Sequence, residues 1–497
     1  MIKSLLVLGG GNAGLMTALY QKTAISNIDI TLIKSNKIGT IGVGEGSTEH
    51  WKRFAQAVGI TLKDLVEECG ATIKIGIKFE NWHGDGTSYY HSLADPYVWT
   101  DGYTGDAHTL MRLIADGTST EELHWDLPMQ GWLSPPFEDY YQFHFDSEKL
   151  NAYLLKRCIE AGIKVIDAEV VDTVLDQNGF VDYVVDSTNA KHHADFFIDS
   201  SGFKRVIASK LGAEWVDWSK YLPMNSAIAF QTPYEEKIPP YTLSKAMDAG
   251  WHWRSPVQDR FGNGYVFSDQ FISEDEAVNE IQKHFTDTIN IGRKINFVSG
   301  KVNKFWIKNC VSIGLSSNFV EPLEASSIST TIQQSRALAG SLATWDRNDT
   351  GTIKEYNKTF DDCLSNVLDF IQLHYFTQRN DTKFWQWCNN EITMTDFNKE
   401  NIEMFKTNFV NQVLLPEDGT HGSFRIYDCL NWIQVMHGLR MFDQKNIKKL
   451  YESRYSHYRT QDIQQLDQLP QTTTGGTWLT CRQAVDSIKG KGITYSL

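Results

Sequence analysis

Residues 2–24 read IKSLLVLGGGNAGLMTALYQKTA, an apolar run that leads directly into glycines and then into a second apolar segment. The run at 2–8 predicts a short buried strand, and the pattern at 15–24 predicts a helix. A further apolar run at 28–33 predicts a second strand, and a strand, a helix and a strand in this order form a βαβ unit. The sequence therefore predicts an α/β fold.

The glycines after the first predicted strand have the spacing of a dinucleotide-binding loop. Gly9 allows a tight turn, Gly11 lets the backbone approach a pyrophosphate, and Gly14 permits close packing of helix on strand. Backbone N–H groups at the start of the helix attract phosphate. The cofactor contacts expected from this loop are Gly9, Gly11, Asn12, Ala13 and Gly14.

The end of the second predicted strand lacks a residue that NAD enzymes use. Lys34 and Ser35 stand where an Asp or Glu usually binds the ribose hydroxyls of NAD. This counts against an ordinary NAD dehydrogenase. FAD, whose ribose can be held by other groups, remains compatible.

Composition excludes several classes of function. The 497 residues carry a formal net charge of −14 without a dense Lys/Arg block, so we expect no nucleic-acid partner. No stretch approaches the roughly 18 consecutive apolar residues of a membrane span, and the N-terminal run resembles a strand more than a signal peptide. The seven cysteines show no C-x-x-C spacing, which favours a reduced, cytoplasmic, soluble chain without a metal site.

Glycines follow apolar runs at other places as well. The segment 42–48, GVGEGST, has the composition of a turn that ends in a Ser/Thr helix cap. The segment 199–203, DSSGF, follows one apolar run, and Gly314 follows another. Several separate junctions of this kind favour a large flavoprotein over a two-site NAD enzyme.

Two acids flank a proline within residues 310–327, CVSIGLSSNFVEPLEASS. Pro322 fixes the backbone between Glu321 and Glu324, and helical periodicity begins near Ile328. Backbone N–H groups that open a helix form a small anion site, which is stronger when buried. The alternative is a capped helix start with two solvated acids.

Two lysines lie within residues 71–82, ATIKIGIKFENW. The alternating isoleucines from Ile73 to Ile77 predict a single strand with one apolar face. Lys74 and Lys78 then share the other face, where the simplest interpretation is a pair of solvated side chains.

Two tryptophans lie two residues apart within residues 250–268, GWHWRSPVQDRFGNGYVFS. On a strand, Trp251 and Trp253 point to the same face because side chains alternate. Two large aromatic rings on one face form a wall, although two ordinary core residues would give the same pattern.

These segments together resemble the flavin-dependent halogenases, especially the tryptophan halogenase group. The family patterns K-x-x-x-K-F-x-N-W, W-x-W-x-I-P and F-[VL]-E-P-L-E-S-T-G match residues 74–82, 251–256 and 319–327. Ser255 replaces the isoleucine of the second pattern, and Ser326-Ser327 replaces the T-G of the third. Further matches extend the resemblance from residue 2 to about 385 and include residues 143–146, 369–372 and 381–385.

The resemblance implies a role for each segment. Lys74 matches the active-site lysine and Glu324 the catalytic glutamate, and the backbone amides of Ser326 and Ser327 would hold halide. Trp251 and Trp253 would separate the flavin from the substrate. The additional FAD contacts implied by the resemblance are Gly42, Val43, Gly44, Glu45, Asp199, Gly202 and Gly314.

The chemistry implied by the resemblance is halogenation of an aromatic compound. A separate flavin reductase supplies FADH2, which reacts with O2, and bound halide is converted to hypohalous acid that crosses an internal tunnel to the substrate. Lys74 would hydrogen-bond this acid or carry it as a haloamine. Glu324 would polarise the oxidant and accept the proton lost from the ring.

The substrate side departs from the tryptophan enzymes. Residues 90–93, YHSL, match a family stretch whose His and Phe sandwich the indole; His91 is kept and Leu93 replaces the aromatic. Near residues 431–435, the paired tyrosines beside the amino-acid head group are absent, and an unpaired zwitterion is costly to bury. We expect an electron-rich small aromatic substrate, such as an indole or a phenol, rather than free tryptophan, with chloride, bromide or iodide.

The architecture implied is a Rossmann-like, GR2-type flavin monooxygenase-like FAD-binding body at 1–345 and a mostly helical substrate-cavity region at 346–497. A flavin-dependent aromatic hydroxylase is the alternative enzyme, and a flavin-binding sensor is the alternative without catalysis. A hydroxylase should lack the tryptophan wall, because its substrate must reach the flavin. The sequence leaves the oligomeric state, regioselectivity and halide preference open.

Overall fold

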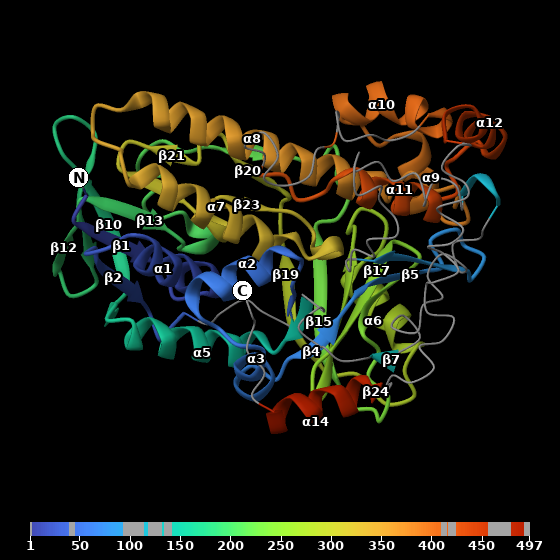
Figure 1. Cartoon of the computed structure of the whole chain (residues 1–497), viewed down its shortest axis with the longest axis horizontal. Helices are drawn as coiled ribbons and strands as arrows, with labels where there is room; N and C mark the ends of the chain where they lie inside the picture. The colour runs from blue at the N-terminus through green and yellow to red at the C-terminus, as the bar shows by residue number, and fades with distance from the viewer. Residues whose placement is uncertain are drawn as a thin grey trace.

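Two large sheets and two long helices organise the chain (Figure 1). The structure is a computed structural model. It describes residues 2–38, 45–92, 114–117, 132–133, 142–408, 415, 424–455 and 479–491.

The first sheet is the predicted nucleotide-binding sheet. Its strands follow the order β21-β22-β13-β1-β2-β9, and every pair is parallel except β21 with β22. The strands are β1 (Ser4–Leu8), β2 (Asp29–Lys34), β9 (Lys164–Asp167), β13 (Phe196–Asp199), β21 (Trp306–Ile307) and β22 (Cys310–Ser312). The predicted βαβ unit is confirmed, and its helix α1 (Asn12–Ala24) begins inside the glycine motif rather than at residue 15.

The second sheet carries the tryptophan pair. Its order is β19-β15-β18-β17-β16-β5-β6, with parallel pairing only between β16 and β5. The strands are β5 (Gly76–Glu80), β6 (Ser88–Ser92), β15 (Ser226–Pro233), β16 (Tyr241–Ala246), β17 (Gly250–Pro256), β18 (Arg260–Phe267) and β19 (Ile291–Asn296). The tryptophan strand β17 is therefore an inner strand, paired on both edges.

The segment around Lys74 forms two strands, so the prediction of a single strand is wrong. β4 (Thr72–Lys74) pairs with β8 (Gln142–Phe145), which also pairs with β3 (Glu45–Gly46), whereas β5 belongs to the second sheet. Ile75 lies between β4 and β5, and its N–H donates to the Pro240 carbonyl at 2.7 Å. The chain thus crosses from one sheet to another directly after Lys74.

Helices cover the sheets and connect them. α7 and α8 run side by side across the top of Figure 1, and α7 also packs on α1 and α2. The helices are α2 (His50–Val58), α3 (Leu62–Glu68), α5 (Ser147–Glu160), α6 (Glu274–Gln282), α7 (Ser326–Leu342), α8 (Thr350–Leu373), α9 (Lys383–Asn390), α10 (Asp396–Thr407), α11 (Cys429–Gly438), α12 (Gln444–Tyr455) and α14 (Cys481–Lys491), with 3-10 turns η4 (Gly202–Lys204), η5 (Gly314–Ser316) and η6 (Pro322–Glu324). The remaining strands are β10 (Val170–Leu175), β11 (Val181–Asp186) and β12 (Lys191–His193) in one sheet, β14 (Trp215–Asp217), β20 (Gly300–Val302) and β23 (Asn318–Phe319) in another, and β24 (Leu479–Thr480) paired with β7 (Trp132–Leu133).

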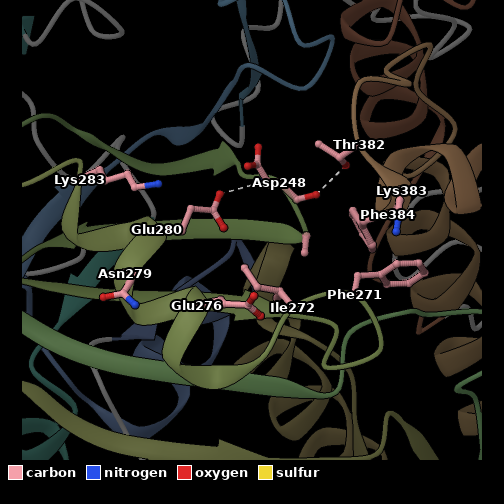
Figure 2. Close-up of a pocket in the computed structure, with 11 residues that line it drawn as sticks. Asp248, Phe271, Ile272, Glu276, Asn279, Glu280, Lys283, Thr382, Lys383 and Phe384 are labelled. Atoms are coloured by element: carbon pink, nitrogen blue, oxygen red, sulfur yellow. Dashed lines mark hydrogen bonds between the residues drawn. The ribbon is translucent and has the colours of Figure 1, made fainter.

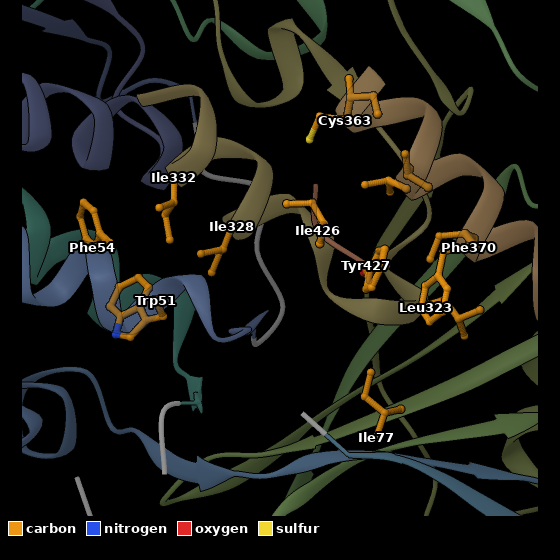
Figure 3. Close-up of a cluster of buried hydrophobic side chains, with 14 of the residues drawn as sticks. Trp51, Phe54, Ile77, Leu323, Ile328, Ile332, Cys363, Phe370, Ile426 and Tyr427 are labelled. Carbon is orange, nitrogen blue, oxygen red and sulfur yellow. The ribbon is translucent and has the colours of Figure 1, made fainter. Parts of the chain in front are cut away.

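One hydrophobic cluster runs through most of the described chain. Figure 3 shows part of it, where Trp51 and Phe54 of α2 face Ile328 and Ile332 of α7. The cluster includes side chains on both sides of residue 345, so a domain boundary there stays a prediction.

The described residues after α7 are mostly helical, as predicted, but their helices do not lie together. α10, α11 and α12 lie at one end of the molecule, whereas α14 packs back on α3 and β4 (Figure 1). No helix among the described residues is long and apolar enough to cross a membrane.

Candidate active site

The N-terminal glycine loop leaves room for a bound group against the backbone. Gly9 has φ +126°, and a Cβ added there would lie 2.1 Å from the Ser200 carbonyl oxygen. A Cβ on Gly14 would lie 2.1 Å from the Gly9 carbonyl oxygen, whereas a Cβ on Gly11 would meet nothing within 4 Å. No side chain caps α1. Uncapped N–H groups beside open space fit a pyrophosphate.

The side chain of Asn151 forms hydrogen bonds with this loop. Its Nδ2 donates to the Gly10 carbonyl at 2.9 Å and to Asn12 Oδ1 at 3.0 Å. Sequence reasoning missed Asn151, because it lies on α5 and no local pattern marks it.

The predicted flavin residues after β13 and β22 lie beside the N-terminal loop. Gly314 has φ +65°, and a Cβ there would lie 2.5 Å from the Ala13 Cβ; Gly202, at the start of η4, has φ +73°. The buried Asp199 carboxylate accepts hydrogen bonds from Ser201 N–H, Ser201 Oγ, Ser316 Oγ, Ile207 N–H and Ala208 N–H. Asp199 therefore shapes the loop that would meet the cofactor.

Some predicted residues lie outside the described chain. These are Gly42, Val43, Gly44 and Leu93; of Glu45 only the backbone is described, as the first residue of β3.

Lys74 is buried, so the interpretation as a solvated lysine is wrong. Only 1% of its surface is exposed, and its Nζ donates to the Ser47 carbonyl at 3.2 Å. A Cβ on Gly46 would lie 2.8 Å from this Nζ, so the amine lies against the end of the segment 42–48. Burial, opposed by the charges of Glu324 and Glu49, lowers the pKa of Lys74 to about 8.

Glu324 is also fully buried, so the solvated interpretation fails here too. Its Oε2 lies 2.8 Å from His91 Nδ1, and its Oε1 lies 2.8 Å from His374 Nε2. Burial acts to raise the pKa of this carboxyl, but His91 and His374 outweigh it and lower the pKa to about 2. Glu324 is therefore a carboxylate held between two imidazole rings.

Lys74 and Glu324 interact without direct contact. No salt bridge of 4.0 Å or less joins them, although the Glu324 charge acts on the lysine. An amine and a carboxylate that do not form an ion pair with each other can both interact with the same small molecule.

Trp251 and Trp253 are a pair of buried rings on one face of β17, as their spacing predicts. The centroids of Trp251 and Trp253 are 6.3 Å apart, and both side chains are buried. Trp253 pairs across the sheet with Gly264, where a Cβ would lie 1.8 Å from the indole. The absence of a side chain at Gly264 thus makes room for the ring.

A second buried glutamate anchors the wall. Glu321 Oε2 accepts hydrogen bonds from Trp251 Nε1 at 3.0 Å and from Tyr375 Oη at 2.6 Å. Burial, opposed by these two donors, raises the pKa of Glu321 to about 7. The turn Glu321–Glu324 therefore connects the tryptophan pair to the Glu324 carboxylate.

The start of α7 fits the predicted anion site. Ala325 precedes the helix in the left-handed conformation, with φ 55°, and no side chain caps the helix. The hydroxyls of Thr330 and Thr331 donate to the Ser327 carbonyl. Because no side chain caps the helix, the amides of Ser326 and Ser327 could hold an anion such as halide.

A separate cleft of about 410 Å³ lies between α6 and the start of α9 (Figure 2). Its polar groups serve the fold: Glu280 accepts from Asp248 N–H and from Tyr265 Oη, and Thr382 donates to the Asp248 carbonyl. The catalytic candidates do not line it.

Sequence comparison connects this geometry to a family. Residues 4–453 match the family model of the tryptophan halogenases. The chain belongs to the tryptophan halogenase family. This halogenase is 31% identical over 462 residues to the tryptophan 6-halogenase ThaL of Streptomyces albogriseolus, and the match covers 85% of this chain and 86% of ThaL. It is 31% identical over 484 residues to the tryptophan 7-halogenase RebH of Lentzea aerocolonigenes, covering 88% of this chain and 89% of RebH.

Solved structures agree with the sequence relatives. The flavin-dependent halogenase Xcc4156 from Xanthomonas campestris superposes with a TM-score of 0.80 at 26% identity, covering 95% of this chain and 97% of that one. BrvH from Brevundimonas sp. BAL3, also a flavin-dependent halogenase, gives a TM-score of 0.80 at 26% identity, covering 100% and 98%. The predicted Rossmann-like FAD fold is confirmed.

The family establishes the general activity. This protein is a flavin-dependent halogenase, an oxidoreductase that uses FADH2, O2 and halide to halogenate an aromatic substrate. Flavin-dependent halogenases rely on a separate flavin reductase for their reduced flavin. Sequence reasoning missed His374 and Tyr375, although they lie two and three residues after the matched segment 369–372.

Proposed function

We propose that this halogenase converts chloride, bromide or iodide to hypohalous acid and directs it to an electron-rich aromatic such as an indole or a phenol. The observation that supports this most strongly is the burial of Lys74 and Glu324 near each other without an ion pair. This arrangement suits delivery of an electrophile through a dry interior.

The cofactor contacts come from three loops. Gly9, Gly11 and Gly14, with the N-terminus of α1, would hold the FAD phosphates, and the loops at Gly202 and Gly314 would complete the cradle. When bound, reduced FAD supplies the electrons with which O2 is activated to oxidise halide. The amides at the start of α7 would hold the halide, and the tryptophan wall would keep the substrate from the flavin.

Lys74 would receive the hypohalous acid. Because its pKa is about 8, both ammonium and free amine are present near neutral pH. The ammonium can donate a hydrogen bond to the acid. The free amine can instead take the halogen to form a haloamine, and the hydroxyl group of the acid leaves with one amine proton as water. Glu324 would orient the oxidant and take up the proton that the aromatic ring loses.

The substrate proposal rests on the polar groups beside the catalytic centre. Asn431 contacts His91, and Gln434 of the same helix binds both backbone groups of Ser92, with Ser92 N–H donating to Gln434 Oε1 at 2.9 Å. These amides are used by the protein and do not offer a site for an amino-acid head group. Tryptophan, which the names of ThaL and RebH give as their substrate, is the competing possibility.

A substrate panel tests the proposal. The protein is supplied with FADH2 and O2 in chloride, bromide or iodide, and products of indole, phenol and tryptophan are identified by mass spectrometry. Halide-dependent products from indole or phenol are expected; a hydroxylated product independent of halide would show a hydroxylase. Equal turnover of tryptophan and indole would contradict the substrate class.

The catalytic assignment is tested with a lysine pair. Lys74→Ala should abolish halogenation while changing FAD affinity by no more than a few fold. Lys78→Ala is the matched control, because Lys78 is only partly buried and pairs with Glu80 at 3.5 Å. Unchanged halogenation in Lys74→Ala would overturn the assignment.

A further inference from the structure

His374, the residue that follows α8, faces a hydrogen-bond acceptor at each ring nitrogen. Its Nδ1 lies 2.9 Å from the Phe370 carbonyl oxygen, and its Nε2 lies 2.8 Å from Glu324 Oε1. A carbonyl oxygen only accepts, so Nδ1 carries a proton. A second proton lies between Nε2 and Oε1. Without it, the unprotonated Nε2 of a neutral ring and the carboxylate oxygen Oε1 would be two acceptors in contact.

His91 on the other side of Glu324 is in a different state. Asn431 Oδ1 accepts from the Asp428 N–H at 2.8 Å in the cap of α11, so Asn431 Nδ2 is the atom that faces His91 Nε2 at 3.0 Å. His91 Nε2 is therefore an acceptor, and the ring is neutral with its proton on Nδ1. That proton is donated to Glu324 Oε2.

The charges of this group follow from the two assignments. His91 contributes no charge when its Nε2 accepts from Asn431, so in this scheme the low pKa of Glu324 rests on His374 and on the hydrogen bond from His91 rather than on a His91 charge. His374 with Glu324 then forms a pair whose net charge is zero. A lone buried carboxylate would favour the ammonium form of Lys74, whereas a neutralised one favours it much less.

We propose that His374 is a fixed imidazolium that neutralises Glu324 and so sets the protonation state of Lys74 during halogenation. The consequence for catalysis rests on the proposed function of Lys74, whereas the charge state of His374 does not. His374 is a positioning residue in this scheme, because it acts on the lysine through Glu324. Its ring is fixed by the aromatic side chains of Phe79, Trp82 and Phe370.

The other titratable groups around the pair are the same in wild type and in a His374 variant, including Glu49, whose charge also raises the pKa of Lys74. Burial, with the Glu324 charge, holds the pKa values of Tyr89 and Tyr427 well above their usual range. Burial, with the Lys74 charge, holds the pKa of His144 well below its usual range. Glu321 titrates near pH 7, so it is controlled for by repeating the experiment in a Glu321→Gln background.

The kinetic test compares pH profiles of halogenation in wild type and His374→Gln. The amide of Gln can still donate to Glu324 but carries no charge. We expect the part of the pH profile that reports the titration of Lys74 to move to higher pH by about one unit or more. A carboxylate without a neutralising partner, several ångströms from the amine in a medium of effective dielectric about 20, raises the pKa of the amine by about that amount. An equal loss of activity at every pH, with that part of the profile unmoved, would overturn the proposal.

A spectroscopic test reads the charge state directly, without flavin or substrate. Protein labelled with ¹⁵N-histidine is examined by long-range ¹H–¹⁵N NMR, and His374 is assigned by the signals lost in His374→Gln, or in His374→Asn if the first variant does not fold. Two protonated ring nitrogens are expected at the pH at which the wild type is assayed. One unprotonated nitrogen there would overturn the proposal, whereas absence of halogenation by the wild type would count against the proposed function alone.

Discussion

Glu321→Gln should make the protein more stable in neutral and alkaline solution while changing little in acid. Both donors, Trp251 Nε1 and Tyr375 Oη, reach the same oxygen, Oε2, so the proton of the acid form is carried by Oε1. A glutamine places its carbonyl oxygen at the Oε2 position and its amide group at the Oε1 position. It therefore reproduces the protonated glutamic acid but can never become charged.

The size of the effect follows from the pKa of Glu321. The folded state raises this pKa from 4.5 to about 7, so the folded protein holds the proton more tightly than the unfolded chain does. The resulting stability is fully present below about pH 4.5 and is lost as the pH rises to about 7. At 1.36 kcal/mol per pKa unit, the loss is about 3 kcal/mol. With an unfolding entropy of about 2.1 cal/mol/K per residue, this corresponds to about 3 °C in the unfolding midpoint.

The assay is thermal unfolding of wild type and Glu321→Gln between pH 4.5 and pH 9. The two midpoints should nearly coincide at pH 4.5, separate as the pH rises to 7, and remain about 3 °C apart above pH 8, with the variant higher. Glu236→Gln serves as the control, because Glu236 is exposed. A difference that is the same at every pH would refute the reasoning, since it would show that Glu321 does not titrate in this range.

Two glycine substitutions test the geometry of the wall and of the nucleotide loop. Gly264→Ala should displace the Trp253 ring and lower stability by about 1–3 kcal/mol, measured by thermal unfolding. It should also increase the peroxide released per FADH2 consumed, measured by a peroxide assay. An unchanged yield of peroxide would contradict the role of the tryptophan wall. Gly292→Ala in β19 is its control, because a Cβ there lies 3.6 Å from the nearest atom. Gly14→Ala should weaken FAD binding at least about tenfold in a fluorescence titration, since its Cβ would lie 2.1 Å from the Gly9 carbonyl oxygen, whereas Gly340→Ala in α7, with nothing within 4 Å, should bind FAD normally.

Local patterns were enough to predict the parts of the fold that are local. The strand, glycine loop and helix from Ser4 to Ala24 form as the sequence indicates, because apolar periodicity and glycine spacing act over a few residues. The alternation of the tryptophans also predicted their common face on β17. The strand break at Ile75 was not predictable in this way, because it depends on β8 and β16, which are distant in sequence.

The candidate site was predicted in its chemical types but not in its electrostatics. Lys74 and Glu324 could be selected from their motifs, yet the patterns alone favoured solvent for the lysine. Burial and partners decide the charge of each group, and the partners of Glu324 lie 233 and 50 residues away in the chain, at His91 and His374. A short motif contains no record of such contacts.

The contact between Asn431 and His91 has a consequence for how this enzyme can be altered. Asn431 lies on α11, in the region expected to shape the substrate cavity, and its Nδ2 donates to His91 Nε2. Exchanging Asn431 for a residue that suits a new compound would therefore remove the donor that keeps His91 Nε2 unprotonated, next to the Glu324 carboxylate. A change at Asn431 therefore affects both substrate choice and turnover. Libraries that vary the rest of α11 and keep Asn431 fixed would change the substrate preference without disturbing His91.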